Sequence, residues 1–161
     1  MTYARWIERL LLALLIGAAP AALAAAETTD PTYASLNRDF GHLKGNYVGT
    51  IKWPVSRQIE ECLTVPDDNK TALADGNTLV SGCRRHDCEE KAAVITGHDG
   101  KELAAGLINF HCTRSSVNCD DAPHLSIFVK RKNLGPALVS ELQAWAKTAA
   151  NATISETVVV P

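Results

Sequence analysis

The chain has 161 residues, a formal net charge of −2 and a hydrophobic content of 46%. This length and composition are those of one domain with a sizeable hydrophobic core. The mild acidity disfavours a nucleic-acid-binding role, because nucleic acids select basic surfaces. It is compatible with a basic protein partner.

The first 26 residues have the pattern of a secretory signal peptide. A basic segment with Arg5 and Arg9 precedes an apolar run, and residues 22–26 offer small side chains at the cleavage positions. The run is too short and too rich in alanine for a membrane span of about 20 residues. We therefore predict export to the periplasm, with residues 27–161 forming a single domain. Since the removed segment carries Arg5, Glu8 and Arg9, a net charge of +1, the mature chain would carry about −3.

The first half of the mature chain predicts two short helices around an extended segment. Residues 35–43 have apolar side chains at helical spacing, and residues 47–53 have an extended pattern. Residues 54–65 begin with Pro54, which suits the first turn of a helix. Residues 66–77 are rich in turn-forming residues.

The second half predicts an antiparallel sheet. Its short apolar segments, several of them rich in β-branched residues, are joined by hairpin-length connections and cover residues 78–82, 91–96, 102–112 and 124–131. Residues 97–100, Gly-His-Asp-Gly, are a turn signal.

Residues 135–150 carry the strongest helix signal, with Pro136 in the first turn and an apolar stripe along one face. Residues 153–161 either close the sheet as a final strand or trail off. Together the segments predict an α+β fold, with an antiparallel sheet of about four to five strands and helices packed on it.

Five cysteines lie at positions 62, 83, 88, 112 and 119, all in the part predicted to be exported. An oxidising compartment favours disulfides, and an odd number leaves at least one thiol unpaired within a monomer. We predict the pairs Cys83–Cys88 and Cys112–Cys119 and an unpaired Cys62, although spacing alone does not fix the connectivity.

Residues 83–88 read Cys-Arg-Arg-His-Asp-Cys, and the predicted Cys83–Cys88 disulfide would close them into a small ring, called the ring below. The four residues between the cysteines can all carry charge. So short a ring removes little entropy from the unfolded chain, so global stability is a poor reason for it. Its better use is to freeze an exposed tip, which lowers the ordering cost of binding by roughly 0.5–1.5 kcal/mol per immobilised side chain. Asp87 stands beside His86 and can orient its imidazole. We predict that all four side chains project outward as a protruding, mostly cationic loop that fits an acidic cleft.

Other interpretations of the ring stay open. It could be a structural staple whose charged side chains are merely solvated. Cys83 and Cys88 could instead join His86, His111 and Cys112 in a metal site, but the spacing differs from that of the usual cysteine pairs, and export favours the disulfide. A catalytic redox pair normally has two intervening residues rather than four. We therefore predict no metal site.

Beyond the ring, the sequence contains no nucleophile-elbow, phosphate-loop or zinc-protease motif. We predict that the protein is not an enzyme and needs no cofactor. We expect His98 in an exposed turn and His111 at the end of a strand, and we expect no partner for His42 or His124.

The ring resembles the Cys-Lys-Pro-His-Asp-Cys loop of the Ivy family, the periplasmic inhibitors of vertebrate lysozyme. The flanking residues 78–82 and 91–108 match the family's order of strand, ring, strand, turn and strand, and the similarity covers roughly residues 77–110. The resemblance implies the Ivy α+β fold. It also implies stoichiometric inhibition of C-type lysozyme by a loop that enters the active-site cleft.

Carried over to this chain, the family's cleft-binding histidine is His86, which would contact the two catalytic carboxylates of lysozyme. Cys83 and Cys88 would hold the loop, and Asp87 would support it. The resemblance also makes a homodimer an expectation. The same loop could serve an alternative role, in which the partners are the cell's own lytic transglycosylases.

Two features depart from the family's pattern. Arg84 and Arg85 stand where the family has lysine and proline, and the loss of proline frees the backbone φ angle at position 85. The cysteines at positions 62, 112 and 119 are additions to the family's ring.

Overall fold

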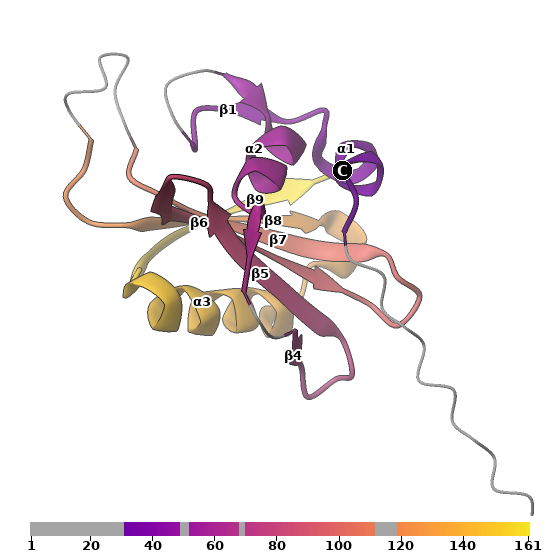
Figure 1. The fold of residues 1–161 in the computed structure, drawn as a ribbon. Helices are drawn as coiled ribbons and strands as arrows, with labels where there is room; N and C mark the ends of the chain where they lie inside the picture. Colours follow the sequence, from indigo (N-terminus) through magenta and orange to yellow (C-terminus); the bar gives the residue numbers. More distant parts are fainter. Residues whose placement is uncertain (1–30, 49–51, 68–69, 112–118) are drawn as a thin grey trace, which may run out of the picture.

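The computed structural model describes residues 31–48, 52–67, 70–111 and 119–161, and it confirms the predicted α+β class. Helices α1 (Tyr33–Phe40) and α2 (Val55–Glu61) lie on one face of a central sheet, and α3 (Pro136–Ala150) lies on the other (Figure 1). The predicted signal peptide falls outside the described residues. Among the described helices, none has both the length and the apolar character needed to cross a membrane.

The remaining elements, in chain order, are β1 (Lys44–Gly45), β2 (Trp53–Pro54), β3 (Val65–Pro66), β4 (Thr71–Ala72), β5 (Thr78–Arg84), β6 (Asp87–Thr96), β7 (Glu102–Asn109), β8 (His124–Lys130), the 3-10 helix η1 (Arg131–Asn133) and β9 (Ile154–Val160). The main sheet has the strand order β3-β5-β6-β7-β8-β9, and β4 also pairs with β5. Strands β1 and β2 form a separate ribbon.

The C-terminal segment closes the sheet as strand β9, which resolves the alternative that the sequence left open. β9 pairs with β8 in parallel, whereas the other pairs of the main sheet are antiparallel. The sequence predicted only antiparallel pairing. The difference arises because α3 carries the chain back along the sheet, so that β9 enters in the same direction as β8.

Local sequence signals explain where the helices begin. α1 starts at a capping box in which the Thr32 and Ser35 side chains each accept a hydrogen bond from the other residue's backbone N–H. α1 therefore begins two residues before the predicted segment, and it ends at Phe40. α3 has Pro136 in its first turn, as predicted. Pro54 was predicted in the first turn of α2, but it lies just before the helix as its N-cap.

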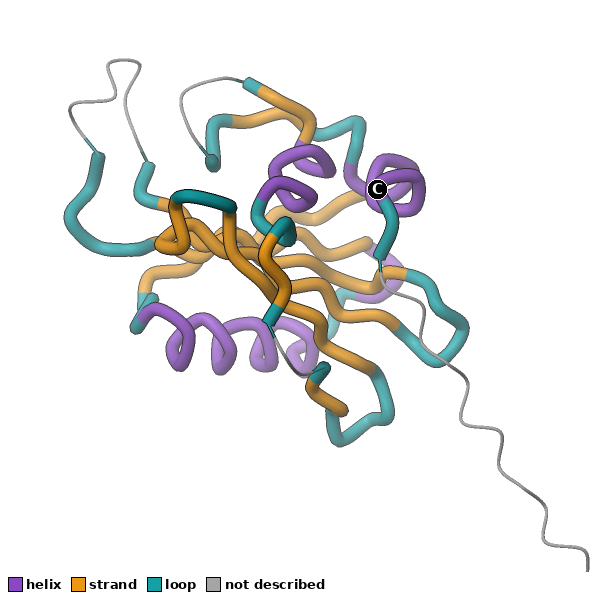
Figure 2. Tube along the Cα trace, viewed as in Figure 1, coloured by secondary structure: helices purple, strands orange, loops and turns teal. Residues whose placement is uncertain are grey.

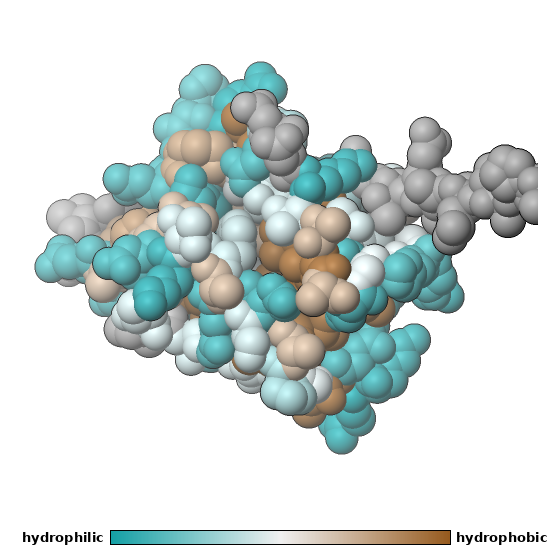
Figure 3. All heavy atoms as spheres, turned by 90° about the horizontal axis from the view of Figure 1, so that it is seen from below, coloured by the Kyte–Doolittle hydropathy of each residue, from teal (hydrophilic) through white to brown (hydrophobic). Residues whose placement is uncertain are grey.

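The sheet is buried on both faces, and alternate residues of its central strands enter two separate cores. Val94 and Phe128 belong to the core under α1 and α2, whereas Ile95 and Ile127 belong to the core under α3. Figure 3 shows the molecule from the α3 side, where hydrophilic and neutral residues make up most of the surface. Leu138 and Leu142 of α3 are buried in the core beneath the helix, so its apolar stripe is turned toward the sheet.

Gln58 of α2 is a fully buried polar residue that fastens the β1–β2 ribbon to the helix. Its Oε1 accepts hydrogen bonds from the backbone N–H groups of Tyr47 and Val48, at 3.0 and 2.8 Å. Its Nε2 donates to the carbonyls of Gly45 and Trp53, at 2.8 and 2.9 Å. The side chain of Gln58 thus forms hydrogen bonds with four backbone polar groups.

Cys62 is a free, fully buried cysteine, in agreement with the predicted unpaired thiol. Because the Cys62 thiol is buried, it cannot form a disulfide with a second copy of the folded chain. Cys119 is disulfide-bonded, and Cys112, its predicted partner, lies outside the described residues.

We expect the Cys62 thiol to be unreactive in the native protein, because burial raises its pKa to about 12 and a thiol must ionise to attack. Ellman's reagent at pH 8 should titrate almost no thiol before unfolding and one thiol per chain in denaturant without reductant. Rapid reaction of one thiol in the native state would contradict the burial.

Candidate functional site

The predicted ring is present as a disulfide-closed hairpin tip that joins β5 to β6. Cys83 and Cys88 are bonded, with their Cα atoms 4.8 Å apart. Arg84 pairs with Asp87 across the turn, so only Arg85 and His86 lie between the two strands. The disulfide therefore clamps a two-residue turn rather than a loose four-residue loop.

His86 occupies the tip of the ring with an exposed side chain. Its φ angle of 70° lies in the left-handed region, which a residue with a Cβ rarely adopts. Such a conformation persists where the surroundings enforce it, and here the disulfide and the flanking strand pairs do so. Within the described residues, no hydrogen bond or ion pair joins Asp87 to His86; instead Asp87 lies opposite Arg84.

The prediction that all four charged side chains project outward is wrong for Arg84. Its side chain is 33% exposed, and its Nη1 lies 2.5 Å from the Oε2 of Glu90, which is 8% exposed. The cause is a register shift in β6, where the partner of Cys83 is Lys91 and the partner of Arg84 is Asp87. The two strands are out of step between these positions, and Glu90 lies beside Arg84.

The hydrogen bond from Arg84 to Glu90 also raises the pKa of the guanidinium, which therefore stays charged. Arg84 thus anchors the base of the ring. Arg85, which is exposed, is the arginine that remains at the tip to meet a partner.

The tip has a second anchor in the segment that follows α2. The backbone N–H of Arg85 donates to Thr64 Oγ1 at 3.0 Å, and Thr64 Oγ1 donates to the carbonyl of Glu61 at 2.8 Å. A proline at position 85, as in the Ivy loop, has no N–H to make this bond. A hydrogen bond to Thr64, in the segment after α2, therefore restrains the tip at the position where the Ivy loop has a proline.

Strand β3 completes the surroundings of the ring. Val65 pairs with Cys83, and its side chain is 42% exposed. The ring is therefore bordered by an apolar side chain that a bound partner could cover.

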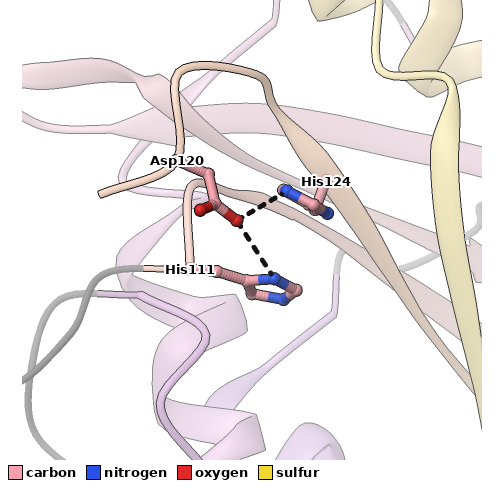
Figure 4. Close-up of side chains that lie close together, drawn as sticks. All are labelled: His111, Asp120 and His124. Carbon is pink, nitrogen blue, oxygen red and sulfur yellow. Dashed lines mark ion pairs between the residues drawn. The ribbon is translucent and has the colours of Figure 1, made fainter. Parts of the chain in front are cut away.

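The same end of the sheet carries a cluster that sequence reasoning missed. Figure 2 shows the ring turn at the same end of the sheet as the described residues that follow β7 and precede β8, in agreement with the registers that pair Lys91 with Ile108 and Asn109 with His124. His111, Asp120 and His124 come together there (Figure 4). The expectation that His124 has no partner is wrong, because its Nε2 lies 2.9 Å from Asp120 Oδ2. Asp120 precedes β8 by a few residues and carried no local motif that could have marked it.

The alternative metal site built on the ring is also wrong. Cys83 and Cys88 are bonded to each other, so neither sulfur is free to act as a thiolate ligand. His98, as expected, is exposed in the turn between β6 and β7, at the opposite end of the sheet from the ring.

Comparison with known proteins gave no match to a family model, a curated protein or a solved structure. The function must therefore be inferred from the molecule itself, and in particular from the ring with its two anchors and its exposed histidine.

Proposed function

We propose that the protein is an exported inhibitor of C-type lysozyme that inserts the ring, residues 83–88, into the active-site cleft. The observation that carries the proposal is the exposed His86 imidazole at the tip of a disulfide-closed hairpin. The resemblance of the ring to the Ivy loop supplies the target class.

The chemistry of the cleft suits an imidazole. A retaining glycosidase holds two carboxyl groups about 5–5.5 Å apart, one protonated and one ionised. A neutral imidazole can accept a hydrogen bond from the protonated group through one nitrogen and donate to the ionised group through the other. Charge-assisted bonds of this kind are the stronger class, and the ring would occupy the space of the sugar.

The restraints on the tip favour tight binding. The disulfide, the Arg84–Glu90 ion pair and the bond from Arg85 to Thr64 hold the hairpin before any partner arrives. Less conformational freedom then remains to be lost on association. C-type lysozymes as a family are basic, so a mature chain with a net charge of about −3 would attract them electrostatically.

A direct assay tests this function. We expect the purified protein to block the lysis of bacterial cell walls by a C-type lysozyme, with inhibition complete near one inhibitor per enzyme. A lytic transglycosylase should be assayed in parallel. Failure to inhibit any C-type lysozyme at micromolar inhibitor would overturn the proposal, and selective inhibition of the transglycosylase would favour the alternative partner.

A further inference from the structure

We propose that His111, Asp120 and His124 form a binding site for a divalent transition metal ion of the zinc type. The cluster joins the end of β7 to the start of β8, and all three side chains point toward one another (Figure 4). The site uses none of the ring residues and does not depend on the proposed function.

The spacing of the ligand atoms suits one ion. Asp120 Oδ2 lies 2.9 Å from His124 Nε2 and 3.8 Å from His111 Nδ1, and the three ligand atoms lie within 4.8 Å of one another. Ligand atoms on one tetrahedral zinc, with bonds of about 2.0–2.2 Å, stand roughly 3.3–3.6 Å apart. Small rotations of the side chains would therefore bring all three atoms onto a common ion.

The donor set selects the class of metal. Two imidazole nitrogens and one carboxylate oxygen suit zinc, copper(II) or nickel(II), whereas calcium and magnesium prefer oxygen ligands throughout. The neighbouring Cys119 is disulfide-bonded and adds no thiolate. Three protein ligands leave a further coordination position for water.

The surroundings hold the ligands in place and leave the site open. The His111 and His124 rings stack with their centroids 4.3 Å apart, and each has a nitrogen close to Asp120 Oδ2. His111 has a left-handed φ of 44°, and its backbone N–H donates to Oδ1 of the fully buried Asn109 at 3.3 Å. The side chain of Asp120 is 53% exposed, so an ion can enter from solvent.

Zinc titration of the untagged, EDTA-dialysed protein by calorimetry tests the site. We expect one zinc per chain, a thermal midpoint that rises with zinc concentration, and no comparable response to magnesium. His111→Ala and His124→Ala should each weaken zinc binding at least about tenfold. The matched controls His98→Ala and His86→Ala should leave zinc affinity unchanged, and the second also distinguishes this site from one built on the ring.

A measurement on the unmodified protein covers the case in which a variant fails to fold. With ¹⁵N-labelled histidine, zinc should shift the ring nitrogen resonances of His111 and His124 and leave those of His86 and His98 in place. Zinc binding that persists in both ligand variants, or ring resonances of His111 and His124 that do not respond, would overturn the proposal.

Discussion

Replacement of His86 by asparagine is expected to weaken lysozyme inhibition at least about thirtyfold, the loss typical of a central interface residue. The imidazole at the tip is the group proposed to bridge the two carboxyls of the cleft. Asparagine tolerates the left-handed backbone better than alanine. The substitution can therefore keep the φ of 70° at position 86 while it removes the imidazole. The inhibition constant is measured by titration against a fixed concentration of lysozyme.

His98→Asn is the matched control, because His98 is also exposed but lies in the turn at the far end of the sheet. It should inhibit as well as the unmodified protein. If His86→Asn retained full inhibition with an unchanged thermal midpoint, the insertion of the histidine would be refuted. The inhibitory function itself is judged separately, by the assay of the unmodified protein.

Replacement of Gln58 by leucine is expected to lower the free energy of unfolding by at least about 3 kcal/mol. The change removes four hydrogen bonds and leaves two backbone N–H groups and two carbonyls without their partner. Each unsatisfied buried group costs about 1–3 kcal/mol, and relaxation of the β1–β2 ribbon toward water would recover part of the total. Urea unfolding monitored by circular dichroism gives the measurement.

Gln143→Leu on α3 provides the comparison. Gln143 is exposed, and its Nε2 donates to Ser155 Oγ at 2.9 Å. Its loss should change stability by no more than about 0.5–1 kcal/mol. Equal effects of the two substitutions would mean that the ribbon does not depend on Gln58.

The features predicted correctly from sequence depend on residues close together in the chain. Pro136 marks the first turn of α3 because its ring presets a helical φ, and no neighbour across the fold is needed for that. The Cys83–Cys88 ring is equally local, since five positions of separation limit how far apart the sulfurs can lie. The same holds for the β6–β7 turn, where Gly100 has the positive φ that a turn signal predicts.

The charged side chains of the ring show where local reasoning fails. Exposure was expected of Arg84 because arginine is a costly residue to bury. The register shift in β6 supplies a carboxylate at Glu90, and a paired arginine can be half-buried. A shift in strand register depends on the pairing of whole strands, which the residues of the ring do not reveal.

Sequence alone was enough to place the first turn of α3, the four long central strands, the turn after β6 and the short disulfide, because each follows from the covalent geometry or periodicity of neighbouring residues. The parallel pairing of β9, the burial of Cys62 and the contact of His111 and His124 with Asp120 became visible only in the folded molecule. These features join segments through strand register and packing. The energies that select them belong to contacts between elements, and no single stretch of sequence contains both sides of such a contact.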